Sequence, residues 1–300
     1  MSQESELTAM LKMYFALSLL FLLAACASEA YTMEETPPPL LDITVFGIGR
    51  ADAILITTNN HAVMIDAGEN RHGMYLLEHL HKQEITHLDY LIITHFDSDH
   101  VGGAHTIVDN LPIGKVIVPD YTRESNHIMR FEQALANAEQ EAYVLTSPMR
   151  FSLDDAEFYV NPAQLTAIGD NMSIVVSVSH GANDFLFTGD AEDRRLRELL
   201  AHDELMATDF DFLKVPRHGR YNRFSVPFIE AISPQYAVIT GFHFLDSAKH
   251  PGERPADMRV IATLYTIGAE VFYTMRETFH LQCNGAEIKI LDTTGFSYSE

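Results

Sequence analysis

The stretch Leu91-Ile92-Ile93-Thr94-His95-Phe96-Asp97-Ser98-Asp99-His100-Val101-Gly102-Gly103 determines how the rest of the chain is interpreted. It begins with an apolar run rich in β-branched residues, which is typical of a buried strand. The run leads into His-x-Asp-x-Asp-His, so four side chains that can bind a metal fall within six residues. A divalent ion needs several nitrogen and oxygen ligands around one point, and a loop leaving a rigid strand can supply them. The alternative interpretation is an inert, acidic surface loop.

The composition limits the classes of function. The chain has 300 residues, and 42 acidic against 20 basic side chains give a net charge of −22. This charge opposes tight non-specific binding to nucleic acid, because such binding depends on Lys and Arg side chains that neutralise phosphates. It does not exclude a nuclease, since bound metal ions reverse the local potential.

The amino-terminal residues have the features of an export signal. A basic residue precedes an apolar run from Tyr14 to Ala25, which is too short for a membrane-spanning helix but suits a signal peptide. The run ends in Leu23-Ala24-Ala25-Cys26, which resembles the lipobox of bacterial lipoproteins. That resemblance implies acylation of Cys26 and a lipid anchor in the cell envelope facing the periplasm, and Ala27 favours the outer membrane. A secretory signal cut at Ala-x-Ala is the alternative.

Hairpin and helix patterns alternate in the remainder of the chain. Signals at 173–179 and 185–187 flank the turn Gly181-Ala182-Asn183-Asp184 and predict a hairpin. Further strands are expected at 43–46, 53–56, 62–67, 115–119 and 210–215, and helices around 76–80, 124–139 and 196–200. This order favours an α/β fold with two mixed sheets face to face and helices outside. We expect a signal peptide over 1–26, a Pro-rich linker over 27–39, the folded domain over 40–292 and a tail over 293–300.

Other candidate ligands lie at the ends of separate predicted strands. Asp190 ends the hairpin in Phe187-Thr188-Gly189-Asp190, and His218 follows the strand 210–215. Asp66 ends a further strand, so carboxylates and imidazoles from distant parts of the chain are available to one site.

This set of motifs is similar to the metallo-β-lactamase superfamily, and more closely to its ComEC/Rec2-like branch, which uses His-x-Asp-x-Asp-His. Four other segments, in the correct order, resemble motifs of that branch: Gly49-Arg50-Ala51-Asp52, Asp170-Asn171-Met172-Ser173, Leu213-Lys214-Val215-Pro216-Arg217-His218-Gly219 and Lys249-His250-Pro251. The resemblance covers about residues 40–291 and implies the αββα sandwich of that superfamily.

The resemblance also implies a ligand set for two divalent ions. His95 and Asp97 would hold one ion, Asp99, His100 and His218 the other, and Asp190 would bridge them. Zinc is the expected metal, and the carboxylate of Asp97 in place of a histidine makes manganese an alternative. Asp66, Asp52 and Asn171 are expected to lie behind the ligands, with Asn171 near the place where other members carry a third histidine.

Two residues depart from the His-His-Gly-Ser motif of the branch. Arg217 replaces its first histidine and Arg220 its serine. The two guanidiniums are expected to bind a substrate phosphate or carboxylate, and pairing with surface acids is the alternative.

The motifs together predict a membrane-tethered, metal-dependent hydrolase that uses a metal-bound hydroxide. Asp99 is assigned to catalysis with His250, which would donate a proton to the leaving group or bind substrate, unless it is a structural loop residue. A small or polymeric phosphodiester is the expected substrate class, because the branch includes presumed nucleases and phosphocholine esterases. The alternatives are a β-lactam or lactone hydrolase on the same site and a non-catalytic binding or assembly lipoprotein.

Overall fold

A computed structural model describes residues 40–164, 169–250 and 252–291. The predicted signal peptide, Cys26, the linker and the tail from 293 lie outside the described residues. In the part that is described, no helix combines the length and the apolar composition needed to cross a bilayer.

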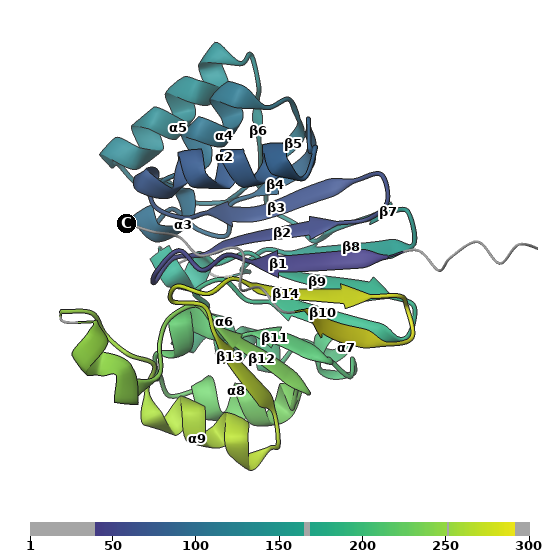
Figure 1. Ribbon diagram of the computed structural model, residues 1–300, viewed down its shortest axis with the longest axis vertical. Helices are drawn as coiled ribbons and strands as arrows, with labels where there is room; N and C mark the ends of the chain where they lie inside the picture. The colour runs from purple at the N-terminus through teal and green to yellow at the C-terminus, as the bar shows by residue number, and fades with distance from the viewer. Residues whose placement is uncertain (1–39, 165–168, 251, 292–300) are drawn as a thin grey trace, which may run out of the picture. The chain divides into compact units, whose positions relative to one another are not determined.

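Two mixed β-sheets face each other, as predicted (Figure 1). The first sheet has the order β15-β14-β1-β2-β3-β4-β5-β6, and the second has the order β13-β12-β11-β10-β9-β8-β7. The strands of the first sheet are β1 (Leu41–Val45), β2 (Ala53–Thr57), β3 (Ala62–Ala67), β4 (Leu88–Ile92), β5 (Ile113–Pro119), β6 (Ala142–Leu145), β14 (Phe279–Cys283) and β15 (Ile288–Leu291). Those of the second are β7 (Met149–Leu153), β8 (Ala156–Asn161), β9 (Val175–His180), β10 (Asn183–Phe187), β11 (Phe212–Lys214), β12 (Tyr236–Ile239) and β13 (Glu270–Tyr273).

Helices cover the outer face of each sheet (Figure 1). The first sheet packs against α2 (Gly73–Lys82), α4 (Ala104–Asn110) and α5 (Asn126–Asn137), and the second against α6 (Asp193–Leu200), α8 (Ser225–Ile232) and α9 (Met258–Thr266). The short helices are α3 (Ser98–Val101) and α7 (Asp203–Met206), with 3₁₀ turns η1 (Asn70–His72), η2 (Gly169–Met172), η3 (Pro216–Gly219) and η4 (Phe244–Lys249). The architecture is therefore the predicted αββα sandwich.

Buried apolar residues form three layers: one between the first sheet and its helices, one between the two sheets, and one between the second sheet and its helices. In β1, Ile43 and Val45 face the second sheet, where they pack with residues such as Phe185 of β10. Ser125 is the N-cap of helix α5, because its Oγ atom accepts a hydrogen bond from the Ile128 amide at 3.3 Å. Its apolar face packs on the first sheet as expected, although the helix ends at Asn137 and leaves Ala138 exposed.

Parallel strands bring several loops to one edge of the sandwich. β3, β4 and β5 pair in parallel in the first sheet, and β10, β11 and β12 pair in parallel in the second. Carboxyl ends of parallel strands share an edge, so the residues that follow β4, β10 and β11 can meet there. This edge carries the His-x-Asp-x-Asp-His segment, Asp190 and His218.

Candidate metal centre

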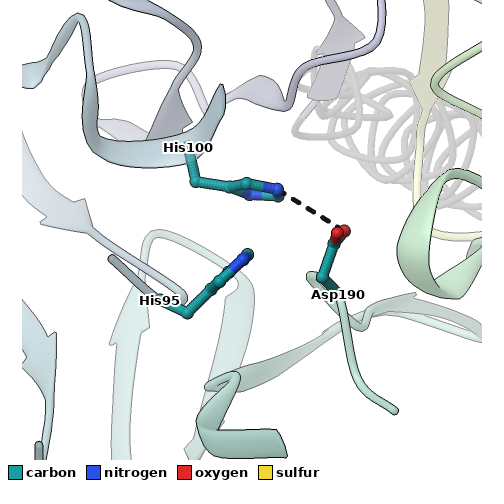
Figure 2. A group of neighbouring side chains, drawn as sticks. All are labelled: His95, His100 and Asp190. Atoms are coloured by element: carbon teal, nitrogen blue, oxygen red, sulfur yellow. Dashed lines mark ion pairs between the residues drawn. The ribbon is translucent and has the colours of Figure 1, made fainter. Parts of the chain in front are cut away.

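The six predicted metal ligands come together at this edge. His95 and Asp97 lie between β4 and α3, while Asp99 and His100 lie on α3 itself, so the expected loop includes a short helix. Asp190 follows β10, and His218 lies in η3 directly after β11. Figure 2 shows His95, His100 and Asp190 pointing toward one another from these separate segments.

One group of three contains Asp99, His100 and His218. One ligand atom from each lies within 4.8 Å of the others. The Oδ2 atom of Asp99 is 3.4 Å from Nε2 of His218. This is the set that the family resemblance assigns to one of the two ions.

Asp190 lies between the histidines. Its Oδ1 atom is 3.4 Å from Nε2 of His100, and its Oδ2 atom is 3.3 Å from Nε2 of His218. His95 and His100 also form a compact group with Asp190, with ligand atoms within 4.8 Å of one another. The carboxylate therefore occupies the place that a bridging ligand needs.

Inward-facing polar atoms show that the residues suit divalent cations. Nε2 of His95, His100 and His218 and Oδ1 of Asp190 are buried and have no hydrogen-bond partner among the described residues. Burying such atoms without a partner is costly, so a native cluster of them requires an explanation. Two imidazole nitrogens or more, together with carboxylates, form the ligand chemistry that zinc and similar ions prefer.

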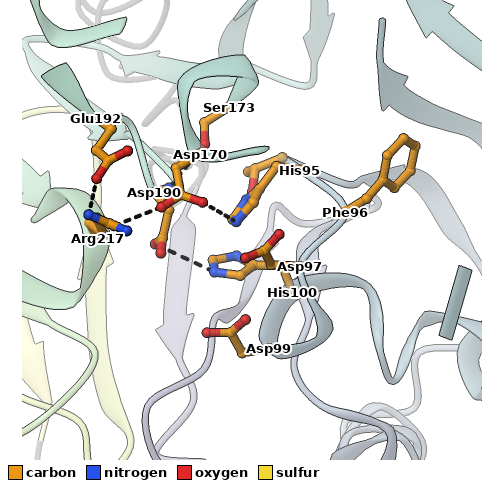
Figure 3. Close-up of polar contacts among 12 residues, drawn as sticks. His95, Phe96, Asp97, Asp99, His100, Asp170, Ser173, Asp190, Glu192 and Arg217 are labelled. Atoms are coloured by element: carbon orange, nitrogen blue, oxygen red, sulfur yellow. Dashed lines mark hydrogen bonds and ion pairs between the residues drawn. The ribbon is translucent and has the colours of Figure 1, made fainter. Parts of the chain in front are cut away.

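Asp170, which was not among the predicted ligands, belongs to a further group of possible ligands. His95, Asp97 and Asp170 place one ligand atom each within 4.8 Å of the others, and Oδ1 of Asp170 is 4.0 Å from Nε2 of His95 (Figure 3). The Asn171 carboxamide, which was expected behind the ligands, instead accepts hydrogen bonds from the amides of Arg194 and Arg195 at the start of α6. Turn η2 directs the carboxylate of Asp170, one residue earlier, toward His95, while the Asn171 carboxamide caps the start of α6.

Asp66 lies behind His100. Its Oδ2 atom is 2.7 Å from Nδ1 of His100, and the amide and hydroxyl of Thr94 donate to the same carboxylate at 2.8 and 2.6 Å. A carboxylate that accepts from Nδ1 fixes the tautomer that directs Nε2 toward a metal. The Thr94 hydroxyl also lies 3.1 Å from Nδ1 of His95, so it links Asp66 with His95, while His100 contacts Asp66 directly.

Asp52 is held by a buried lysine. The ammonium of Lys214 pairs with Asp52 and donates to the carbonyl of Gly189 at 3.0 Å, and Oδ1 of Asp190 is 3.7 Å from the same nitrogen. The backbone amide of Asp52 donates to the carbonyl of Asp99 at 3.0 Å. Lys214 was not among the predicted site residues, although a lysine in the otherwise apolar strand β11 is a signal of a buried charge.

The surrounding charges shift the pKa values of the cluster. Burial alone would raise the pKa of Asp190, but the charges of His218 and His100 hold it well below its usual range. Burial opposes protonation of His100, yet Asp66, Asp190 and Asp52 raise its pKa well above the usual value. The pKa of His95 is lowered by burial and by the neighbouring His100, so its imidazole is neutral and available as a ligand.

The two arginines beside the site differ in their partners. Nε of Arg217 lies 2.7 Å from Oδ2 of Asp170, and the same guanidinium pairs with Glu192 (Figure 3). Arg217 thus follows the alternative of pairing with acids. No described acid pairs with Arg220.

The backbone around His218 is unusual. Arg217, His218 and Gly219 have φ values of 51°, 52° and 75°, all in the left-handed region. Non-glycine residues adopt this region at some energetic cost, and such conformations cluster at functional sites. The imidazole of His218 is fixed by Thr240, whose carbonyl and hydroxyl oxygens lie 3.0 and 2.9 Å from Nδ1.

His250 is not brought into the cluster. Its ring packs against Phe242 with centroids 4.5 Å apart, and no described contact joins it to the six candidate ligands. A proton-donor role for His250 stays a prediction.

Comparison with known sequences supports the resemblance. The family model of the metallo-β-lactamase superfamily matches residues 47–243. The chain is 27% identical over 231 residues to competence protein ComA of Neisseria gonorrhoeae, covering 75% of this chain and 30% of that protein. It is 26% identical over 217 residues to recombination protein 2 of Haemophilus influenzae, covering 69% and 25% respectively. The ComE operon protein 3 of Bacillus subtilis is 24% identical over 223 residues, covering 66% and 28%. These similarities confirm the ComEC/Rec2-like resemblance, and the chain spans less than a third of the length of these relatives.

Solved structures confirm the fold. The metallo-β-lactamase fold protein YhfI of Bacillus subtilis superposes with a TM-score of 0.51 at 11% identity, covering 79% of this chain and 96% of that one. A CmlA β-hydroxylase mutant gives a TM-score of 0.51 at 14% identity, covering 83% and 55%. Because one neighbour is a hydroxylase by name, the fold alone does not select hydrolysis.

Proposed function

Because this chain belongs to the metallo-β-lactamase superfamily, we propose that it is a metal-dependent hydrolase of phosphodiesters. The observation that carries the proposal is the convergence of buried, unpartnered imidazole nitrogens with the Asp190 carboxylate. His95, Asp97 and Asp170 would hold one divalent ion, and Asp99, His100 and His218 the other, with Asp190 between them. Two ions bound there would polarise the substrate and lower the pKa of water.

The protein groups have separate tasks in this proposal. Asp66 orients His100, and Thr240 orients His218, so the ligand atoms are positioned before any ion arrives. The carboxylates of Asp97 and Asp170 make the first position harder than the second. Zinc is proposed as the metal because both groups contain imidazole nitrogens, and manganese is the alternative at the first position because of its two carboxylates.

Two observations support a phosphodiester over a carbonyl substrate. Two relatives are named competence protein ComA and recombination protein 2, and recombination is a process of nucleic acids rather than of β-lactams. Arg220, two residues after His218, supplies positive charge beside the cluster, whereas the charge of Arg217 is paired with Asp170 and Glu192. The net charge of −22 favours a small or locally bound phosphodiester over tight non-specific contact with a long nucleic acid.

The proposed location is the cell envelope. It rests on the apolar run and the lipobox-like Leu23-Ala24-Ala25-Cys26, which would anchor the chain through acylated Cys26 on the periplasmic side, with the outer membrane favoured. Labelling cells with a palmitate analogue would reveal the lipid on the wild-type chain, and a Cys26→Ser variant should lose it. A wild-type chain without label would refute the anchor.

The experiment that tests the activity combines metal analysis with two substrates. Protein purified without added metal would be analysed for bound ions and assayed with bis-p-nitrophenyl phosphate and nitrocefin. We expect about two ions per chain and phosphodiester turnover. Asp99→Asn should bind fewer ions and lose more than about 100-fold in kcat/KM, because a ligand to one ion is removed. Asp109→Asn is the matched control, since this exposed carboxylate lies on α4, outside the cluster.

Each other outcome would refute part of the proposal. Protein that binds no divalent ion would refute the metal site. Turnover of nitrocefin alone would assign the site to a β-lactam or lactone. Two bound ions without turnover of either substrate would favour a binding or assembly lipoprotein.

A further inference from the structure

Arginines from three separate segments gather beside the metal centre. Arg50 lies in the loop between β1 and β2, Arg217 and Arg220 flank His218, and Arg254 precedes α9. Oδ1 of Asp52, two residues after Arg50, lies 3.5 Å from Nδ1 of His218, so the loop that carries Arg50 adjoins the segment that carries Arg217 and Arg220. In a chain with 42 acidic and 20 basic residues, a group of like positive charges is unexpected.

Backbone contacts hold these segments against the site. Two residues after Arg50, the Asp52 amide donates to the Asp99 carbonyl at 3.0 Å, which ties that loop to the metal-binding helix α3. The amide of Arg220 donates to the Arg217 carbonyl at 2.9 Å. The amide of Asp257 donates to the Gly219 carbonyl at 2.9 Å, so the segment that carries Arg254 packs against η3.

The arginines differ in how their charges are compensated. Arg217 pairs with Asp170 and Glu192. Among the residues that the structure describes, no acid pairs with Arg50, Arg220 or Arg254. The Nε atom of Arg50 is in addition buried without a hydrogen-bond partner. Like charges repel one another, and a buried donor without a hydrogen-bond partner costs free energy. An anion bound here would reduce the repulsion and accept the hydrogen bond.

We propose that Arg50, Arg220 and Arg254 form a subsite for a second phosphate group of the substrate, beside the phosphodiester that is cleaved. The inference rests on the proposed function and specifies its substrate as a molecule with at least two phosphates. Guanidinium groups bind phosphate oxygens through two parallel, charge-assisted hydrogen bonds, which a neutral residue cannot reproduce. Arg220 stands where the resembled motif has a serine, so a positive charge replaces a neutral side chain at this position of the chain.

A binding experiment tests the subsite without requiring turnover. Isothermal titration calorimetry would compare thymidine 3′,5′-bisphosphate with thymidine 5′-monophosphate on the metal-loaded protein. We expect the wild-type protein to bind the bisphosphate about 10-fold more tightly, and the preference to weaken as the salt concentration rises. The double variant Arg50→Gln/Arg220→Gln should lose this preference. The control Arg150→Gln, which removes one charge at β7 where Arg150 pairs with Glu204, should keep it.

Equal affinity for the two nucleotides in the wild-type protein would overturn the subsite, as would the same loss of preference in Arg150→Gln. A preference that salt does not change would also overturn it, because the proposed contacts are electrostatic. If the protein prefers the bisphosphate but cleaves no phosphodiester, the subsite stands and the proposed activity fails.

A kinetic comparison would then distinguish the two sources of the second phosphate. A dithymidylate with a free 5′ hydroxyl, the same compound with a 5′-terminal phosphate, and a trithymidylate without terminal phosphates would be compared by kcat/KM. Preference for the terminal phosphate assigns the subsite to a chain end, and preference for the trithymidylate assigns it to an internal diester. The absence of both preferences would contradict the inference.

Discussion

Replacement of Lys214 by methionine should destabilise the protein strongly. The Lys214 ammonium is buried, pairs with Asp52, lies 3.7 Å from Oδ1 of Asp190 and donates to the Gly189 carbonyl at 3.0 Å. Methionine fills nearly the same volume but removes the charge, so Asp52 would stay buried without its cation. Removing one partner of a buried ion pair typically costs about 3–5 kcal/mol.

Urea unfolding measures this cost. Lys214→Met, Asp52→Asn and the double variant would be compared with wild type in the presence of chelator, so that metal binding does not contribute. We expect a loss of about 3–5 kcal/mol for Lys214→Met, and a smaller loss in the double variant than the sum of the single losses. Lys289→Met, on an exposed position of β15, is the control and should change stability by less than about 0.5 kcal/mol.

The result that would refute this reasoning is a loss below about 1 kcal/mol for Lys214→Met. Additive effects of the two substitutions would refute the direct coupling of Lys214 with Asp52, because independent sites add and paired sites do not.

Three other substitutions test separate parts of the structure. Asp66→Asn should weaken metal binding about 10–100-fold by calorimetry, because the carboxylate orients His100, and an unchanged affinity would contradict that role. Burial and the charge of Lys82 lower the pKa of His79 to about 4 from 6.5, so between these pH values the unfolded chain binds more protons and stability rises with pH. His79→Gln should flatten this rise in urea unfolding, and an unchanged slope would argue against it. Arg195→Met should cost about 3–5 kcal/mol, because the buried guanidinium pairs with Glu198 and donates to a buried carbonyl, and a change in Tm of only one or two degrees would contradict this.

The sequence predicted those features that local chemistry determines. An apolar strand followed at once by His-x-Asp-x-Asp-His fixes where four ligands lie, and the glycine-containing turn fixes the β9–β10 hairpin. Glycine at 103 follows from close packing, because a Cβ atom there would lie 2.2 Å from the Ala67 carbonyl oxygen.

Features that depend on tertiary packing could not be predicted in the same way. Asp170 and Asn171 are adjacent polar residues, and only the packing of η2 beside α6 decides which of them faces His95. The same limit applies to Arg217, because its ion pair with Asp170 depends on how η3 packs against η2 in the folded protein. No element was expected between 140 and 162, where β6, β7 and β8 lie, because charged and turn residues interrupt the apolar alternation there.

The candidate ligands are contributed by both sheets, with His95 to His100 following β4 of the first and Asp190 and His218 following β10 and β11 of the second. Any ion held by all of them would therefore resist separation of the two layers as well as serve chemistry. Its binding would add to the free energy of unfolding by an amount that grows with the logarithm of the free metal concentration once that concentration exceeds the dissociation constant. When metal is scarce, proteases would then degrade the protein faster, and the metal-free protein would also lack the proposed activity. The amount of protein and its activity would therefore decline together.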